Sequence, residues 1–154
     1  MVRADGVDDF VKSRDAYNKL HEWLDAKQLK DTSVSIGPRG SYFARRGQDW
    51  ISHGLPKDLM AKLDRHKNEF TPIHVALGIH GAWILLWSDG DVAWNLRNFY
   101  PSLASGPALT GGVGQVTFAA LNPYEDDGYF IMGDDGCSLN ADLSSFEERI
   151  YTRW

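Results

Sequence analysis

The stretch ALGIHGAWILLWSDG, residues 76–90, decides the fold of this chain. Its apolar run, AWILLW, lies between one turn that contains Gly81 and a second that contains Asp89-Gly90. Asp-Gly between apolar segments is a strong hairpin signal, and glycine adopts the positive φ of a tight turn at little cost. The stretch therefore predicts a central strand with an antiparallel neighbour on each side.

The same pattern occurs elsewhere in the chain. Residues 35–47, SIGPRGSYFARRG, align with residues 76–88 at an offset of 41 and match both glycines of the Gly-x-x-Gly segment. A more degenerate copy, FAALNPYEDDGYFIMGDDG, occupies residues 118–136. The glycines expected to make the first turn of each copy are Gly40, Gly81 and Gly128. Self-similarity at a fixed period is typical of repeat proteins, so we expect three repeated units.

Each unit is expected to form a three-stranded antiparallel meander followed by a helix. The first strands are expected at 33–36, 74–77 and 116–121, and the second strands at 41–45, 82–87 and 129–132. The second strands of the middle and third units are apolar at every position instead of alternating. We therefore expect both of their faces to be covered.

Amphipathic helices are the expected cover. Apolar residues fall on one stripe in LPKDLMAKLDRH, residues 55–66, and recur at similar spacing in LSSFEERIYTRW, residues 143–154. Residues 7–28 carry a broader apolar face and predict the longest helix. Residues 98–115 contain two prolines and four glycines, which favours a short turn and a loop there.

These elements predict an α+β fold in a single domain, residues 1–154. The N-terminal helix is assigned to residues 1–32, and the repeats to 33–73, 74–115 and 116–154, the last of which closes with a C-terminal helix.

The order of strand, Gly-x-x-Gly, aromatic strand, glycine turn and GLP-initiated helix loosely resembles the blades of β-propeller-type repeat proteins of fungi and protists. The resemblance extends over residues 33–154 and implies blade-like sheets. A propeller blade usually has four strands, whereas each unit here has three and a helix. Closure of a ring by this chain is therefore not implied.

Charge and composition exclude several classes of function. A net charge of −5 and a pI near 5.4 argue against binding to nucleic acid or to anionic membranes, which both require a basic surface. The longest apolar run, 82–87, is far too short to cross a bilayer. Cys137 is the only cysteine and the first twenty residues lack the plan of a signal peptide, so we expect a cytoplasmic protein.

Charge is distributed unevenly along the chain. Between Arg39 and Lys67 there are seven Lys or Arg residues against three acidic ones, whereas residues 121–142 contain six acidic residues and no basic one. A basic first repeat and an acidic third repeat could associate head to tail in a homo-oligomer. A dipolar, fully solvated surface without a partner is the equally valid alternative.

The residues selected as candidates for binding a ligand or partner are Arg39, Tyr42, His80, Trp83, Trp87, Trp94 and Tyr124. The aromatic ones combine apolar area with a polar tip, which suits recognition, but core packing in strands explains the same residues. Arg39, His80 and the loop 123–127 occupy equivalent loop tips, where a rigid scaffold usually carries recognition.

No metal site, cofactor or catalytic residue is predicted. His74, His80, Asp89 and Asp91 could approach one another, but they lack the compact spacing of metal ligands. Cys137 follows two aspartates, which would raise the pKa of a thiol and disfavour a reactive thiolate.

Three functions are consistent with these observations. The leading hypothesis is a non-catalytic recognition module that binds a protein or small molecule through its loop tips. The second is a small enzyme with a tryptophan-lined pocket for an apolar substrate, in which His53, His74 or His80 acts as general base. The third is a structural subunit whose role is self-assembly.

Overall fold

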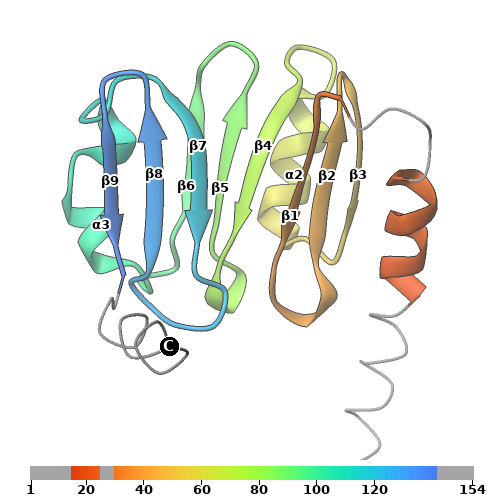
Figure 1. Cartoon of the computed structure of the whole chain (residues 1–154), viewed down its shortest axis with the longest axis horizontal. Coiled ribbons are helices and arrows are strands. Elements are labelled where there is room, and N and C mark those ends of the chain that lie inside the picture. The colour runs from red at the N-terminus through yellow and green to blue at the C-terminus, as the bar shows by residue number, and fades with distance from the viewer. Residues whose placement is uncertain (1–14, 25–29, 142–154) are drawn as a thin grey trace, which may run out of the picture.

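The computed structural model describes residues 15–24 and 30–141 and has an α+β fold with three separate, open antiparallel sheets (Figure 1). The first sheet consists of β1 (Thr32–Ile36), β2 (Tyr42–Arg46) and β3 (Asp49–His53). The second consists of β4 (Pro72–Leu77), β5 (Trp83–Trp87) and β6 (Val92–Asn95). The third consists of β7 (Val116–Leu121), β8 (Tyr129–Gly133) and β9 (Cys137–Asn140). The second strand is the central one in every sheet, as the sequence predicted.

Helices connect the sheets. Residues 15–24 are helical, α2 (Lys57–His66) joins the first sheet to the second, and α3 (Pro101–Ser105) joins the second to the third. Single 3-10 turns occur at η1 (Pro38–Gly40), η2 (Ile79–Gly81) and η3 (Ala108–Thr110). The short α3 and the loop after it agree with the expectation for a segment rich in proline and glycine.

Two of the three expected helices lie partly or wholly outside the described residues. Residue 30 begins a turn and Thr32 opens β1, so the assignment of the N-terminal helix to residues 1–32 was too long. The expected helix at 143–154 lies outside the described residues.

Three apolar clusters form the core of the described residues, and each cluster contains residues of one helix and of one or two sheets. The helix at 15–24 places Ala16 and Leu20 against Tyr42 and Ala44 of the first sheet. Between the first and second sheets, α2 contributes Leu59 and Leu63, which pack with Phe43, Val75, Trp83, Leu85 and Trp87. Between the second and third sheets, α3 contributes Leu103, which packs with Ile84, Leu86, Ala119, Leu121 and Ile131. Each sheet thus shares its core with the next one.

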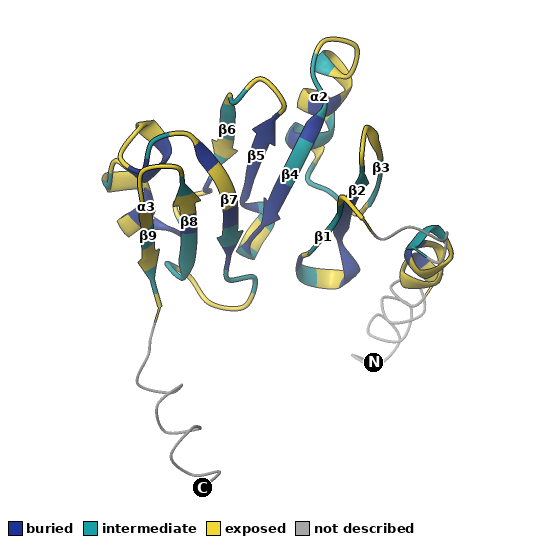
Figure 2. Cartoon of the chain, turned by 45° about the horizontal axis from the view of Figure 1, so that its top comes forward, coloured by how far each residue is buried: buried dark blue, intermediate teal, exposed yellow. Residues whose placement is uncertain are grey.

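The second strand of the middle sheet is covered on both faces, as predicted. Every residue of β5 is buried, and Figure 2 shows this strand dark blue along its length. The same expectation for β8 is wrong within the described part of the chain, where Ile131 is fully buried but Met132 on the opposite face is 42% exposed. The reason is that only one side of the third sheet has a described neighbour.

The first turns of the first two sheets have nearly identical backbones. Arg39 and His80 both adopt the left-handed conformation, with φ of 57° and 53°, and each is followed by a glycine with positive φ. In the third sheet the expectation for Gly128 is wrong, because Asp127 has the positive φ of 60°. Gly128 is instead needed for space, since a Cβ there would lie 2.9 Å from the Cβ of Asn122.

Glycines at the ends of the first strands allow neighbouring sheets to approach closely. A Cβ on Gly37 would lie 2.6 Å from the Cβ of Leu77, and a Cβ on Gly78 would lie 3.0 Å from Cδ1 of Leu121. Both glycines have φ near −120°, so the requirement is for space and not for an unusual backbone conformation. The first strands β1, β4 and β7 are consequently packed against one another.

His74 is the titratable group at the contact between β4 and β7. Its Nε2–H donates to the carbonyl oxygen of Ala119 at 2.6 Å, and its ring lies 4.8 Å from that of Phe118. Burial lowers the pKa of His74, the hydrogen bond to Ala119 opposes this shift, and the positive charge of Arg45 reinforces it. The folded protein therefore favours the neutral form of the imidazole more than the unfolded chain does.

Replacing Gly78 by Ala should lower the free energy of unfolding by about 2–3 kcal/mol, because the added methyl group overpacks the contact with Leu121 and Tyr100. Urea denaturation followed by circular dichroism measures this. The control is Gly47→Ala, which has positive φ but open space around it and should cost about 1 kcal/mol. Equal losses in the two variants would contradict the packing argument.

The contribution of His74 to stability should depend on pH. Because its folded-state pKa is lowered, the unfolded chain binds more protons than the folded one between that value and about 6.5, the ordinary histidine value. The free energy of unfolding should therefore fall as the pH is lowered through this window. Chemical denaturation at a series of pH values should show the loss in the wild type and a weaker loss in His74→Gln.

Candidate functional site

The first turns of the first and second sheets lie side by side and form a cleft of about 650 Å³. It lies at the end of the molecule that carries η1, η2 and Pro123 of the loop after β7. The lining residues are Pro38, Arg39, Ser41, Gly54, Pro56, Leu77, Gly78, Ile79, His80, Gly81, Ala82 and Pro123. The cleft thus joins elements that are far apart in the sequence.

Arg39 and His80 are the ionisable side chains that line this cleft, and no carboxylate lines it. They occupy equivalent positions in η1 and η2, where both residues have left-handed backbone angles. Most of the other lining comes from prolines, glycines and the apolar residues Leu77, Ile79 and Ala82. The cleft thus combines an apolar surface with the guanidinium group of Arg39 and the imidazole of His80.

Phe99 and Arg97 contact the turn η2, which carries His80. The imidazole of His80 lies 4.4 Å from the ring of Phe99. Arg97 donates from Nε to the carbonyl oxygen of Gly81 at 3.2 Å. These contacts connect the second turn to the chain that follows β6.

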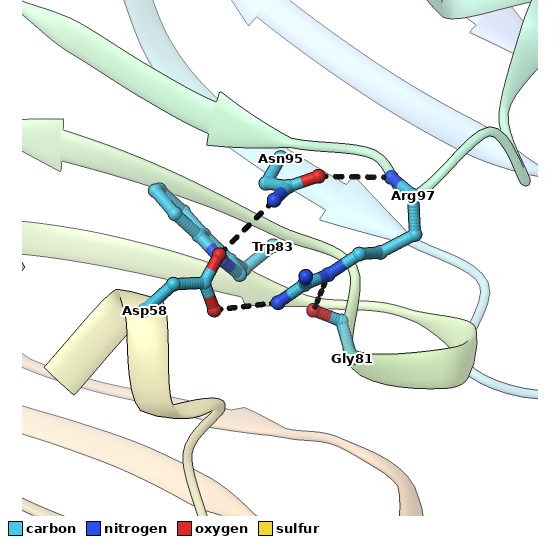
Figure 3. A network of polar contacts seen from close by, with 5 residues as sticks. All are labelled: Asp58, Gly81, Trp83, Asn95 and Arg97. Atoms are coloured by element: carbon cyan, nitrogen blue, oxygen red, sulfur yellow. Dashed lines mark hydrogen bonds and ion pairs between the residues drawn. The ribbon is translucent and has the colours of Figure 1, made fainter.

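Asp58, in the first turn of α2, accepts hydrogen bonds from Trp83, Asn95 and Arg97 (Figure 3). Its Oδ2 accepts from Trp83 Nε1 and from Asn95 Nδ2, both at 3.0 Å. Its Oδ1 pairs with Arg97 Nη2 at 2.5 Å. Arg97 therefore bridges the carboxylate of Asp58 and the carbonyl of Gly81, which ties α2 to the wall of the cleft.

The electrostatics of Asp58 favour its ionised form. Burial by itself would raise the pKa of this carboxyl group, but the hydrogen bonds from Trp83 and Asn95 and the charge of Arg97 outweigh it, and the pKa lies below the ordinary aspartate value. The resulting ion pair balances the charge of Arg97. Among the side chains that line the cleft, Arg39 and His80 are the ones with ionisable groups.

Tyr100 holds the second turn against the third sheet. Its fully buried hydroxyl group accepts from the backbone N–H of Ile79 at 2.8 Å and donates to the carbonyl oxygen of Asn122 at 2.6 Å. Burial raises the pKa of Tyr100, so the hydroxyl keeps the proton that it donates. One side chain thus sets the position of η2 relative to the loop that contains Pro123.

Three of the aromatic candidates are part of the core and do not line the cleft. Tyr42 is 2%, Trp83 4% and Trp87 3% exposed. Tyr42 stacks between Tyr17 and His53, with ring centroids 6.3 and 5.9 Å away. Trp87 meets the ring of His66 edge-on at 5.8 Å, and Trp83 donates to Asp58. The structure shows packing contacts for all three.

The two remaining aromatic candidates are exposed but separate. Tyr124 is 80% exposed, next to the cleft residue Pro123. Trp94 is 39% exposed and lines a smaller cleft of about 320 Å³, which includes Gly90, Gly114 and Gln115. The structure therefore brings Arg39 and His80 together but does not assemble the aromatic candidates into one site.

The described residues contain no group of three or more His, Cys, Asp or Glu side chains that could hold a metal ion. None of the described helices has the length and apolar character needed to cross a membrane. Of the histidines considered as a general base, His74 already donates to Ala119, His53 stacks on Tyr42, and His80 lies in the main cleft.

Several residues that surround or support the cleft do not stand out in the sequence as candidates for a binding site. Pro56, Asp58 and Arg97 surround the second turn, and Tyr100 supports it from the interior. Asp58 in a first helical turn resembles an ordinary helix-stabilising carboxylate, and Tyr100 follows no motif. Their roles depend on contacts across 16 to 39 residues of sequence, which local patterns do not encode.

Comparisons with protein-family models, with curated proteins and with solved structures find no match to this chain.

Replacing Tyr100 by Phe should lower the free energy of unfolding by about 2–4 kcal/mol, because the Ile79 N–H and the Asn122 carbonyl would each lose a buried partner. Thermal or urea denaturation measures the loss. Tyr124→Phe, at an exposed position, is the matched control and should change stability by less than about 0.5 kcal/mol. A Tyr100→Phe protein as stable as the control would rule out the proposed support of the turn.

Proposed function

We propose that this protein is a non-catalytic recognition module, and that its main cleft binds a small molecule with an apolar body and one anionic group. The single observation that carries the proposal is the convergence of Arg39 and His80 in a cleft that has an otherwise largely apolar lining and no lining carboxylate. Arginine and histidine both donate hydrogen bonds to carboxylate or phosphate oxygens. Prolines, Leu77 and Ile79 supply the apolar surface.

The size and position of the cleft support a small ligand in preference to a protein. Its volume of about 650 Å³ lies within the usual range for small-molecule sites, about 300–1,000 Å³. It is formed by turns on a scaffold of packed sheets, and turns of this kind commonly carry binding residues. Binding of a protein through the same loop tips is the alternative outcome.

We also propose that the three sheets are degenerate copies of one unit and stand beside one another like blades. The matching angles at Arg39 and His80 support this, as do the equivalent contacts of Gly37 with Leu77 and Gly78 with Leu121. The helices would then fill the spaces between blades. In this arrangement the first turns of successive blades gather at one end, where the cleft lies.

The other two hypotheses have less support. A histidine general base usually needs a carboxylate partner, and the lining of the main cleft supplies none to His80. Self-association of the basic first unit with the acidic third unit remains a prediction from charge.

The test uses benzoate as an anionic probe and benzamide as its neutral counterpart. Two-dimensional amide NMR should show benzoate shifting residues 39–41 and 79–82, with benzamide binding more weakly. Arg39→Gln should weaken benzoate binding about tenfold, the factor that corresponds to about 1.4 kcal/mol, and should leave benzamide binding unchanged. Arg65→Ala, at the far end of α2 from Pro56, is the control and should bind as the wild type does.

Two results would contradict the proposal. If benzoate and benzamide shift the cleft amides equally, the anionic group is not recognised. If benzoate shifts amides elsewhere and leaves residues 39–41 and 79–82 unchanged, the cleft is not the site.

A further inference from the structure

The third sheet carries an apolar face that the rest of the described chain leaves largely uncovered, apart from the ring of His74 against Phe118. Cross-strand pairing places on one face the residues Phe118, Ala120, Phe130, Met132, Cys137 and Leu139. Phe118, Met132 and Leu139 are 38%, 42% and 52% exposed, and none of the core clusters of the described residues includes any of the six. We call this set the outer face of the third sheet.

In the first two sheets, the equivalent face is covered by the segment that follows the third strand. After β3, the helix α2 brings Leu59 and Leu63 to a cluster that contains Phe43 of the first sheet. After β6, the helix α3 brings Leu103 to a cluster that contains Ile84 and Leu86 of the second sheet. Ile84 and Leu86 lie two residues apart in β5, on the face that packs toward the third sheet, and are only 0% and 1% exposed. The corresponding cover for the third sheet would come from the residues that follow β9.

A further sheet could not stack on the outer face in the way that the existing sheets stack. That contact uses a glycine directly after the first strand, Gly37 or Gly78, and the residue after β7 is Asn122. The Oδ1 of Asn122 accepts from the backbone N–H groups of Tyr124 and Glu125, so this side chain shapes its own loop. The close approach of another sheet at this point would meet a side chain instead of open space.

The geometry points to one occupant: we propose that residues 142–154 of this chain pack on the outer face of the third sheet. The segment begins two residues after the end of β9 at Asn140. Its apolar residues Leu143, Phe146, Ile150 and Trp154 recur at intervals of three and four, which places them on one side of a helix.

Cys137 provides an internal probe of this contact. It is the only cysteine of the chain, and it pairs with Met132 on the outer face. A packed segment would shield its thiol, whereas an open face leaves it accessible to a water-soluble reagent. The rate of thiol modification in the intact chain therefore reports whether the face is covered.

The experiment measures the rate at which Cys137 of the full chain reacts with 5,5′-dithiobis(2-nitrobenzoate). The double variant Phe146→Ala/Ile150→Ala should react about tenfold faster than the wild type, the change that corresponds to about 1.4 kcal/mol of lost protection. The matched control is Ser145→Ala/Thr152→Ala on the opposite side of the same segment, which should react at the wild-type rate. Both pairs are neutral, so neither alters the thiolate electrostatically.

Equal rates in the wild type and in both variants would overturn the proposal. A wild-type rate that falls as the protein concentration is raised would also overturn it, because a second copy would then be the cover. Where the Phe146→Ala/Ile150→Ala protein unfolds, the losses of melting temperature in Met132→Ala, Ile150→Ala and their combination decide instead. Non-additive losses support contact between these two residues, and additive losses overturn it.

Discussion

The structure depends on close contact between the ends of the first strands of neighbouring sheets. Gly37 has no side chain where Leu77 packs, and Gly78 has none where Leu121 packs. Leu77 and Leu121 are 4% and 6% exposed, and each belongs to one of the apolar clusters between neighbouring sheets. Because the first strands are held this closely, the helices α2 and α3 fill the space left between neighbouring sheets.

The same contact creates the main cleft. Bringing β1 and β4 together also brings together the turns that follow them, with Arg39 in one and His80 in the other. Tyr100 then fixes the second turn through two hydrogen bonds, and Arg97 connects that turn to Asp58 of α2. The positions of Arg39 and His80 therefore follow from packing that lies outside the cleft.

The first and third sheets differ from the second in how much of their surface is covered by described residues. The helix at 15–24 covers Tyr42 and Ala44 of the first sheet but leaves Ile36 of β1 54% exposed. At the other end, Asn122 replaces the glycine that mediates stacking, and the outer face of the third sheet is apolar. Under the proposed arrangement of repeated units, a side chain at this position would interrupt the stacking contact that Gly37 and Gly78 allow.

Local sequence determined the strands, their order within each sheet and the turns between them. Gly-x-x-Gly and Asp-Gly punctuate apolar runs, and the energetics of positive φ and of strand burial act over a few residues, so β2, β5 and β8 were located within one residue at each end. Sequence also placed Arg39 and His80 at equivalent loop tips. It did not separate Trp83 and Trp87, which are core residues, from the exposed Trp94, because strand aromatics look alike until their faces are known.

Only the tertiary structure decided which sheet faces meet, why Gly37 and Gly78 lack side chains, and that Tyr100 supports the cleft. It also assigned the positive φ of the third turn to Asp127 and showed that Gly128 lacks room for a side chain beside Asn122. These features are contacts between residues distant along the chain. Their free energy depends on the distance between packed surfaces, which no local pattern of residues specifies.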